Sequence, residues 1–464
     1  EISLTYQALD FEARKIAAQL QALNLSQKQA ILLYQPELEL ICAFFGCLYA
    51  DVVAIPAYPP QYNQNLSRFQ GIITDSQASV ILTTTALLKD CPEFPNLSYL
   101  TTDCLSDSSA HAWRKPKIDR DTLAFIQYTS GSTGSPKGVM LSHGNLLHNS
   151  RLIYQGFEHS SQSKVVSWLP PYHDMGFIGG ILQPFYGGFP VVLMSPVSFI
   201  RKPIRWLQAI SRYQATTSGG PNFAYNLCLQ KITPQQKATL DLSSWKLAFI
   251  GAEPISPQTL DQFAEAFAPC GFRRDAFYPC YGLAEATLFV SGGFIKETAI
   301  QQKVVSCGHY SEQTVIIVDP KEGWETKPLQ DGEIGEIWVS GASVAQGYWN
   351  QPEKTQETFH ANLEKTSFLR TGDLGFLQNG ELYVTGRIKD LIIIRGQNYY
   401  PQDIEQTVEQ SHVAIRPGCC AAFSISEGEE QLAIAAEIKR ESIRQLNLEE
   451  VLTAIRSVIA QEHG

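Results

Sequence analysis

The sequence predicts an α/β protein that is built from more than one domain. Its 464 residues are too many for a single hydrophobic core. Hydrophobic residues make up 44% and charged residues 18%, which is the balance of a globular protein rather than a disordered one. Strand-like and helix-like segments alternate as far as Cys280, and short β-rich segments replace them from Val304 onward.

The N-terminal part of the chain establishes the alternation. Apolar residues in Leu4–Leu23 recur at the helical period and predict an amphipathic helix. A strand-like run at Ala30–Tyr34 and a buried helix at Glu37–Leu48 follow. Two more strands are predicted at Val52–Pro56 and Ser79–Thr83. Strands separated by helices are typical of a parallel sheet.

The alternation continues in the middle of the chain and then changes. Further strands are predicted at Lys164–Trp168, Pro190–Met194, Leu247–Ile250 and Phe277–Cys280. The later segments TVIIVD, GEIWVSG and GELYVTG are separated by Gly and Asp turns, which predicts an antiparallel or barrel-like unit. Beyond Lys389, two strands and helices near Gln402–Gln410 and Glu449–Gln461 predict the start of a small α+β domain.

Charge, hydropathy and cysteine spacing argue against several classes of protein. The net charge of 36 − 46 = −10 disfavours nucleic acid or an anionic membrane as a partner. The apolar run Phe177–Met194 is interrupted by Gln183, Pro184 and Pro190, so we interpret it as buried core strands and turns and not as a membrane span. The ten scattered cysteines contain no CxxC pair, which favours free thiols in a reducing cytoplasm.

The segment Tyr128–Gly138, YTSGSTGSPKG, is the sharpest chemical signal, and it directly follows the apolar strand Leu123–Gln127. Small residues let the backbone curl and expose N–H groups, while hydroxyls and a lysine add donors, which suits an ATP triphosphate. It is not a Walker A loop, because Gly138 follows Lys137 where Ser or Thr is required. A flexible linker is the alternative, but linkers rarely combine these residues directly after a strand.

This loop resembles the phosphate loop of the adenylate-forming superfamily, which includes acyl-CoA synthetases, peptide-synthetase adenylation domains and luciferases. Four further motifs follow in that family's order, with Ala284 where threonine is usual: GAEP at Gly251–Pro254, YGLAEAT at Tyr281–Thr287, RTGD at Arg370–Asp373 and GRIKD at Gly386–Asp390. The resemblance implies a large N-terminal domain, residues 1–388, with two α/β subdomains and a β-barrel-like subdomain. A small, incomplete α+β C-terminal domain would occupy residues 389–464.

The resemblance also implies roles for single residues. Glu285 would help to hold Mg²⁺ at the phosphates, and Lys137 would act beside it as a second catalytic group. Tyr281 would pack against adenine, Asp373 would bind the ribose hydroxyls, and Arg387 would contact the nucleotide. Lys389 and Asp390 would form the hinge. The complete ATP- and AMP-binding set that is implied consists of Thr129, Ser130, Gly131, Ser132, Thr133, Gly134, Gly251, Ala252, Glu253, Tyr281, Gly282, Asp373 and Arg387.

A narrower resemblance is to fatty acyl-AMP ligases. It is carried by Ser167–Gly176 (SWLPPYHDMG), Thr216–Cys228 (TTSGGPNFAYNLC) and Ile392–Glu405 (IIIRGQNYYPQDIE). These enzymes make acyl-adenylates from fatty acids and ATP and pass the acyl group to the phosphopantetheine thiol of an acyl carrier protein, often on a polyketide synthase. They discriminate against coenzyme A and carry an insertion, which would lie at His360–Phe368 and is short in this sequence.

Fewer sequence features support the part of the predicted site that would bind the acyl chain. His173 matches the family position at the mouth of the acyl pocket, and we predict that it is catalytic; a hydrogen-bonded core histidine is the alternative. The Phe-Asp-x-Ser pattern of amino-acid-activating relatives is absent, which favours an uncharged, apolar acid. Small residues would leave room for a chain in the predicted pocket wall, which consists of Gly219, Gly220, Asn222 and Phe223.

Ile200–Gln214 is the main basic segment. A solvated helix face is the default interpretation, and a docking patch for an acidic carrier protein is the sharper hypothesis. The cations concerned are Arg201, Lys202, Arg205 and Arg212.

One family element is not found. Relatives supply a lysine from a C-terminal motif such as PKTSSGK, and the sequence given ends at Gly464 before such a motif. Lys389 and Lys439 do not fit it, so we expect the C-terminal domain to be truncated before the catalytic lysine. Three hypotheses remain: a fatty acyl-AMP ligase that feeds a carrier protein, an acyl-CoA ligase, and a nucleotide- or acyl-binding module without turnover.

Overall fold

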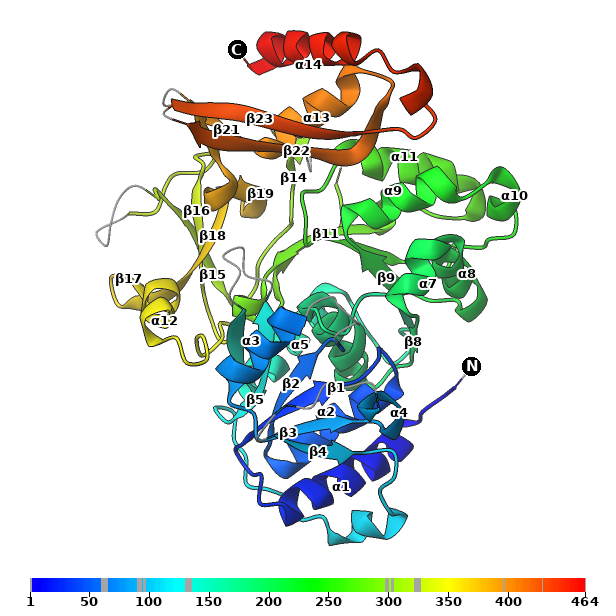
Figure 1. Cartoon of the computed structure of the whole chain (residues 1–464), viewed down its shortest axis with the longest axis vertical. Coiled ribbons are helices and arrows are strands. Elements are labelled where there is room, and N and C mark those ends of the chain that lie inside the picture. Colours follow the sequence, from blue (N-terminus) through cyan, green and yellow to red (C-terminus); the bar gives the residue numbers. More distant parts are fainter. Residues whose placement is uncertain are drawn as a thin grey trace.

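A computed structural model gives the fold, and it describes residues 2–59, 66–89, 94, 97–129, 136–296, 300–301, 304–320, 327–394, 397–427 and 429–463. Figure 1 shows the N-terminal unit in blue at one end of the molecule and the C-terminal segment in orange and red at the other. The green second unit and the yellow antiparallel strands lie between them. The arrangement confirms the predicted α/β class.

The first unit is a six-stranded sheet in the order β4-β3-β1-β2-β5-β6, parallel throughout except for the antiparallel pair β5 and β6. Alternate residues of β1 point to opposite faces, as the pleat requires. Ala30 and Leu32 pack in the core with α1 (Tyr6–Ala22) and α2 (Leu38–Ala50), whereas Ile31 and Leu33 pack with α3 (Leu66–Ser76). The other elements are β1 (Gln29–Leu33), β2 (Val53–Ala57), β3 (Val80–Thr83), α4 (Thr85–Leu88), β4 (Ser98–Thr101), β5 (Leu123–Thr129) and β6 (Lys137–Ser142).

The second unit is another six-stranded sheet, in the order β12-β11-β10-β9-β7-β8, with only β12 antiparallel to its neighbour. Its core is rich in aromatic residues and includes the fully buried Trp206, Trp245 and Phe263. The strands are β7 (Val165–Ser167), β8 (Val191–Leu193), β9 (Thr217–Gly220), β10 (Leu247–Ile250), β11 (Phe277–Gly282) and β12 (Phe289–Gly292). The helices are α5 (His143–Gly156), α7 (Pro196–Arg201), α8 (Ile204–Tyr213), α9 (Asn222–Lys231), α10 (Pro234–Lys237) and α11 (Pro257–Phe267).

The apolar run Phe177–Met194 corrects one prediction. Strands and turns were expected, but Met175–Leu182 forms a π-helix and α6 (Gln183–Gly187) continues it before the short strand β8. Seven of the eight π-helical residues are buried, so the segment is apolar on all sides. Such a run has neither a two-residue nor a 3.6-residue period, and its pattern therefore cannot separate a buried helix from a buried strand.

The β-rich segments form the five-stranded antiparallel sheet that their turns predicted. The stretch His360–Phe368, where an insertion was expected, is a tight hairpin in which Leu363 pairs with Thr366. The elements are β15 (Thr314–Val318), β16 (Gly335–Ser340), α12 (Pro352–Phe359), β17 (Ala361–Leu363), β18 (Thr366–Gln378) and β19 (Glu381–Arg387). A separate small pair consists of β13 (Ile300–Gln301) and β14 (Val304–Val305).

The C-terminal segment has a core of its own around Ile404, Val408 and Ile415. It contains β20 (Ile392–Ile394), β21 (Gln397–Tyr399), α13 (Pro401–Ser411), β22 (Ile415–Glu427), β23 (Glu429–Ile438) and α14 (Leu448–His463). The domain boundary at residue 389 stays a prediction. Within the described residues, no helix is both long enough and apolar enough to cross a membrane.

We predict that Leu152→Ala on α5 lowers the free energy of unfolding by about 2–5 kcal/mol, because this side chain is buried and its removal leaves a cavity. Leu147→Ala on the same helix is the matched control, since Leu147 is 55% exposed, and it should change stability by less than about 0.5 kcal/mol. Urea unfolding of both variants measures the difference. Equal losses would contradict this account of the core.

Candidate active site

A cavity of about 1200 Å³ lies where the three sheets and the start of the C-terminal segment meet. Strands β5, β6, β11 and β18 contribute to its walls, together with the π-helix and the loop between β11 and β12. Most of the predicted site residues that the structure describes line this cavity: Thr129, Lys137, His173, Ala252, Tyr281, Gly282, Glu285, Asp373, Arg387 and Lys389.

At one side of the cavity, a tyrosine and an arginine hold a buried carboxylate. The Tyr281 hydroxyl donates to Asp373 Oδ2 at 2.7 Å, and Arg387 Nε lies 3.2 Å from Asp373 Oδ1. Burial raises the pKa of Asp373, while the Tyr281 hydrogen bond and the Arg387 charge oppose that rise and the charge of Glu285 adds to it. Tyr281 comes from β11, Asp373 from β18 and Arg387 from β19, so this cluster joins two sheets.

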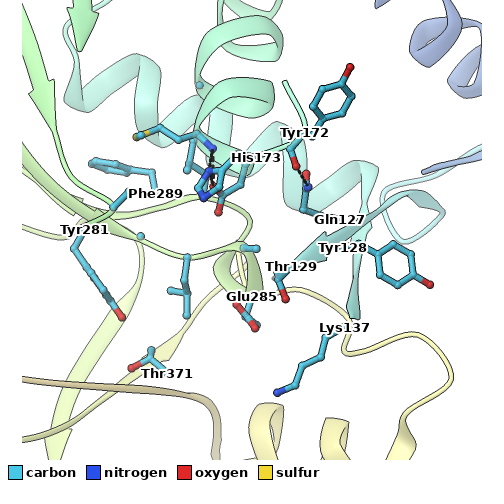
Figure 2. Close-up of a pocket in the computed structure, with 18 of the residues that line it drawn as sticks. Gln127, Tyr128, Thr129, Lys137, Tyr172, His173, Tyr281, Glu285, Phe289 and Thr371 are labelled. Atoms are coloured by element: carbon cyan, nitrogen blue, oxygen red, sulfur yellow. Dashed lines mark hydrogen bonds and ion pairs between the residues drawn. The ribbon is translucent and has the colours of Figure 1, made fainter. Parts of the chain in front are cut away.

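A second carboxylate, Glu285, enters the cavity from the loop between β11 and β12. Figure 2 shows it between Tyr281 on one side and Thr129 and Lys137 on the other. The Tyr348 hydroxyl donates to Glu285 Oε1 at 2.7 Å, and Lys137 Nζ lies 5.0 Å from the centre of the Tyr348 ring. Burial, followed by the charge of Glu285, raises the pKa of the Tyr348 phenol, so this hydroxyl stays protonated and remains a donor.

His173 lies just before the π-helix and lines the same cavity. Its Nδ1 is 2.5 Å from Asp174 Oδ1, and its side chain is 59% exposed. The Asp174 carboxylate raises the pKa of His173 by hydrogen bonding and by charge, against the opposing effect of burial. This exposure favours the predicted functional role over a histidine held in the core, although the catalytic role itself stays a prediction.

Another part of the cavity is a mainly apolar arm between the second sheet and α5. Its walls include Phe157, Phe249 and Phe289, and the ring of Phe157 is 5.9 Å from each of the other two. His159 and Thr217 are the polar residues of this arm. The arm has the character of a binding site for an alkyl chain, because apolar walls lower the free energy of a buried hydrocarbon.

Several predicted residues are not among those that line the cavity. The Glu253 carboxylate accepts a hydrogen bond from Phe223 N at 2.5 Å, at the start of α9. Gly219 and Gly220 are buried on β9, where a side-chain Cβ would collide with Phe249 and Trp168. Gly251, Asn222, Phe223 and Asp390 are also absent from the lining. The roles given to these residues stay predictions, while Ser130, Gly131, Ser132, Thr133 and Gly134 lie outside the described residues.

The strained turn that follows Glu285 is not predicted from the sequence. Thr287 is fully buried with φ +70° and ψ −64°, and Leu288 N donates to the Ala286 carbonyl at 2.9 Å, which defines a γ-turn. Such a conformation is costly for a β-branched residue. The Thr287 hydroxyl donates to the Ser343 carbonyl at 2.6 Å, and Asn149 on α5 donates to Ser343 Oγ at 3.0 Å.

Glu336 is a further acidic group at the cavity, and sequence inspection did not single it out. The residue is almost completely buried, and Arg370 Nη2 lies 2.9 Å from its Oε2. Trp338 Nε1 donates to the same oxygen at 3.0 Å, and Gly372 N donates to Oε1 at 3.2 Å. Because all these partners surround the RTGD motif, Glu336 fixes the backbone that presents Asp373.

Comparison with known proteins agrees with this geometry. The AMP-binding enzyme family model matches residues 1–349, and the model for the AMP domain of Disco-interacting protein 2-like proteins matches residues 389–464. The medium-chain-fatty-acid–[acyl-carrier-protein] ligase JamA of Moorena producens is 46% identical over 99% of this chain and 84% of its own length. The corresponding ligase TtuA of Teredinibacter turnerae is 36% identical over 95% of this chain and 80% of its own length.

A solved structure is similar as well. The fatty acyl-adenylate ligase of Legionella pneumophila, in complex with acyl adenylate and pyrophosphate, has a TM-score of 0.81 and 42% identity. The match covers 100% of this chain and 86% of that one. The fold and the cavity therefore define an adenylate-forming ligase, a class of enzyme that uses ATP. The chain belongs to the AMP-binding enzyme family, and within that family to the fatty acyl-AMP ligases.

We predict that Asp174→Asn lowers the pKa of His173, because the main partner of the protonated ring is lost. NMR titration of the ring resonances measures this shift. Since the folded pKa is raised, the stabilising effect of the pair is present below about pH 6.5 and is lost as the pH rises through the folded pKa. The free energies of unfolding of wild type and variant should therefore differ at acidic pH and become similar above the folded pKa of His173. An unchanged His173 titration would contradict the assignment.

We predict that Thr287→Val lowers the free energy of unfolding by about 1–3 kcal/mol, because the buried Ser343 carbonyl loses its donor. Thr287→Ser keeps the hydroxyl and should retain most of the stability. Chemical denaturation of the two variants side by side separates the loss of the hydrogen bond from the loss of side-chain volume. If serine were as damaging as valine, the hydrogen bond would not be the reason that Thr287 occupies this turn.

Proposed function

We propose that this protein converts a fatty acid and ATP into an acyl-adenylate and pyrophosphate, and then transfers the acyl group to the phosphopantetheine thiol of an acyl carrier protein. One observation carries the proposal: a single cavity joins the Tyr281, Asp373 and Arg387 cluster to an apolar arm, with His173 in the same lining. The names of JamA and TtuA support a carrier protein as acceptor and a medium-chain acid as substrate.

In the first step, a carboxylate oxygen of the fatty acid attacks the α-phosphorus of ATP, and the bond to pyrophosphate breaks. Asp373 accepts hydrogen bonds from the ribose hydroxyls, and Tyr281 packs against adenine. Arg387 and Lys137 bring positive charge to the developing negative charge on the phosphate oxygens. Backbone N–H groups of residues 130–134 complete the phosphate site, as the sequence motif predicts.

A magnesium ion fits the acidic side of this cavity. Mg²⁺ is commonly bound by one or two carboxylates together with phosphate oxygens of the substrate, and Glu285 supplies a carboxylate in the lining. No cluster of three or more metal-binding side chains occurs in the described part of the chain. When bound, Mg²⁺ would neutralise phosphate charge, and Glu285 would hold the ion beside Lys137.

In the second step, the thiol sulfur attacks the acyl carbonyl carbon and AMP leaves. We place the hinge for this step at Lys389 and Asp390, which are exposed and lie with Ile388 in one helical turn after β19. The carrier protein would approach over α7 and α8, where Arg201, Lys202, Arg205 and Arg212 are all exposed. An acidic carrier, which we propose belongs to a polyketide synthase, suits this basic face.

The cysteine thiols in the described part of the chain are relevant to the cellular compartment of the protein. Nine cysteines there are free and none forms a disulfide, which supports the prediction of a reducing cytoplasm.

The test of the function uses the protein with its natural C-terminus, ATP, Mg²⁺ and a medium-chain fatty acid. Portions receive either coenzyme A or a holo acyl carrier protein, and mass spectrometry identifies the products. Acyl-AMP and acyl-carrier protein without acyl-CoA are expected. Abundant acyl-CoA would instead identify an acyl-CoA ligase, and the absence of adenylate with every acid would favour a binding module without turnover.

We predict that Asp373→Asn lowers kcat/KM for ATP about tenfold to a hundredfold, because a hydrogen-bonded carboxylate is lost from the ribose site. Asp121→Asn is the control, since this aspartate is exposed and does not line the cavity. Initial rates of pyrophosphate release at varied ATP give the parameter for both variants. An unchanged kcat/KM in the Asp373 variant would remove this residue from the nucleotide site.

A further inference from the structure

We propose that His159 and Thr217 form a subsite for a hydroxyl group at the far end of the acyl arm, so that the preferred substrates include fatty acids hydroxylated at the end of the chain. This inference rests on the proposed function. It concerns His159 and Thr217, which line the cavity among otherwise apolar walls. His159 is 7% exposed and Thr217 is 4% exposed, so their polar atoms face the cavity and the protein interior rather than bulk solvent.

The hydrogen bonds of His159 establish which of its ring nitrogens is an acceptor. The Gln183 side chain satisfies both its ends when its amide nitrogen donates to the Ser150 carbonyl and its oxygen accepts from Tyr154 N. In this orientation the same oxygen accepts from His159 Nδ1 at 3.3 Å. His159 therefore carries its proton on Nδ1, and Nε2 keeps a free lone pair. Burial lowers the pKa of His159 to about 4, so the ring is neutral near pH 7.

Thr217 is the partner of that lone pair, but only a weak one. Its Oγ1 lies 3.4 Å from His159 Nε2, which is longer than a well-formed hydrogen bond. The hydroxyl has one proton and two lone pairs, and its proton is directed at His159. The remaining hydrogen-bonding positions of the His159 and Thr217 pair are therefore all acceptors. A ligand that fits must bring a donor, and a neutral hydroxyl does so without adding charge.

Aromatic rings lie close to the polar pair His159 and Thr217. The His159 ring lies 5.5 Å from the Phe157 ring and 4.8 Å from the Phe189 ring, measured between centroids. A methyl group placed against this pair gains no hydrogen bond and displaces any solvent from two buried acceptors, which is unfavourable. A terminal hydroxyl restores the lost bond. An acyl chain that ends in an alcohol or a phenol therefore matches both the apolar walls of the arm and the polar pair at its end.

The test compares ω-hydroxy fatty acids with methyl-terminated fatty acids that have the same number of heavy atoms, over a series of chain lengths. The readout is kcat/KM for acyl-adenylate formation with ATP and Mg²⁺, measured on the protein with its natural C-terminus. We expect the ratio of hydroxy acid to methyl-terminated acid to reach a maximum at one chain length. At that length, Thr217→Val should lower the ratio about three- to tenfold.

Two further variants distinguish the loss of the Thr217 hydroxyl from a general loss of folding. Thr217→Ser keeps the hydroxyl and should keep the preference. Thr366→Val is the matched control on an exposed hairpin, and it should leave the ratio unchanged. A wild-type ratio at or below one at every length, or a ratio that Thr217→Val does not alter, would overturn the inference while adenylate formation continued. Absence of adenylate with every acid of both kinds would overturn the proposed function and this inference together.

Discussion

The candidate site depends on buried polar contacts between segments that are distant in the sequence. The bond from Tyr281 to Asp373 joins the second sheet to the antiparallel sheet. The bond from Tyr348 to Glu285 links the loop between β16 and α12 to the loop between β11 and β12. A buried acceptor that loses its donor carries a large desolvation penalty. The bond from Tyr281 to the buried Asp373 therefore favours the observed arrangement of the two sheets, and the half-buried bond from Tyr348 to Glu285 adds to it. The cavity is the space that this arrangement leaves between the sheets, so Asp373 and Glu285, two of the acidic residues that line it, also connect its walls.

The two carboxylates also explain why the nucleotide end needs cations. Glu285 and Asp373 share one cavity, and the charge of Glu285 contributes to the raised pKa of Asp373. A triphosphate that enters this space brings further negative charge. Arg387, which is paired with Asp373, and Lys137, which lies over Tyr348, offset part of it. The other cations of the lining are Arg68, Arg370, which is paired with Glu336, and Lys389. The proposed role of Mg²⁺ follows from this imbalance, because the ion would neutralise phosphate charge at the point where Glu285 is fixed.

Much of the fold could be predicted because strands and amphipathic helices leave periodic patterns. β1, β2 and β3 lie within one or two residues of their predicted bounds. The π-helix could not be predicted, because a segment that is buried on all sides has no period. Residues in short motifs, such as Asp373 and Glu285, were found from sequence. Thr217 and Thr287 lie within the quoted segments TTSGGPNFAYNLC and YGLAEAT but have no predicted role there, and His159 lies in no quoted motif. What these three residues do depends on which side chains the tertiary fold places beside them.

The position of the proposed hinge has a consequence for the two half-reactions. Arg387 ends β19, and the turn that contains Lys389 and Asp390 follows immediately. A rotation at those two residues would move the chain beyond them while β19 stays in its sheet. The ion pair between Arg387 and Asp373 would then persist in both steps, and the adenylate would keep its ribose contacts. Only residues beyond the hinge would change their contacts with the cavity. The nucleotide contacts would therefore stay the same in both steps, while the C-terminal segment would rearrange at the side of the cavity where the thiol must enter.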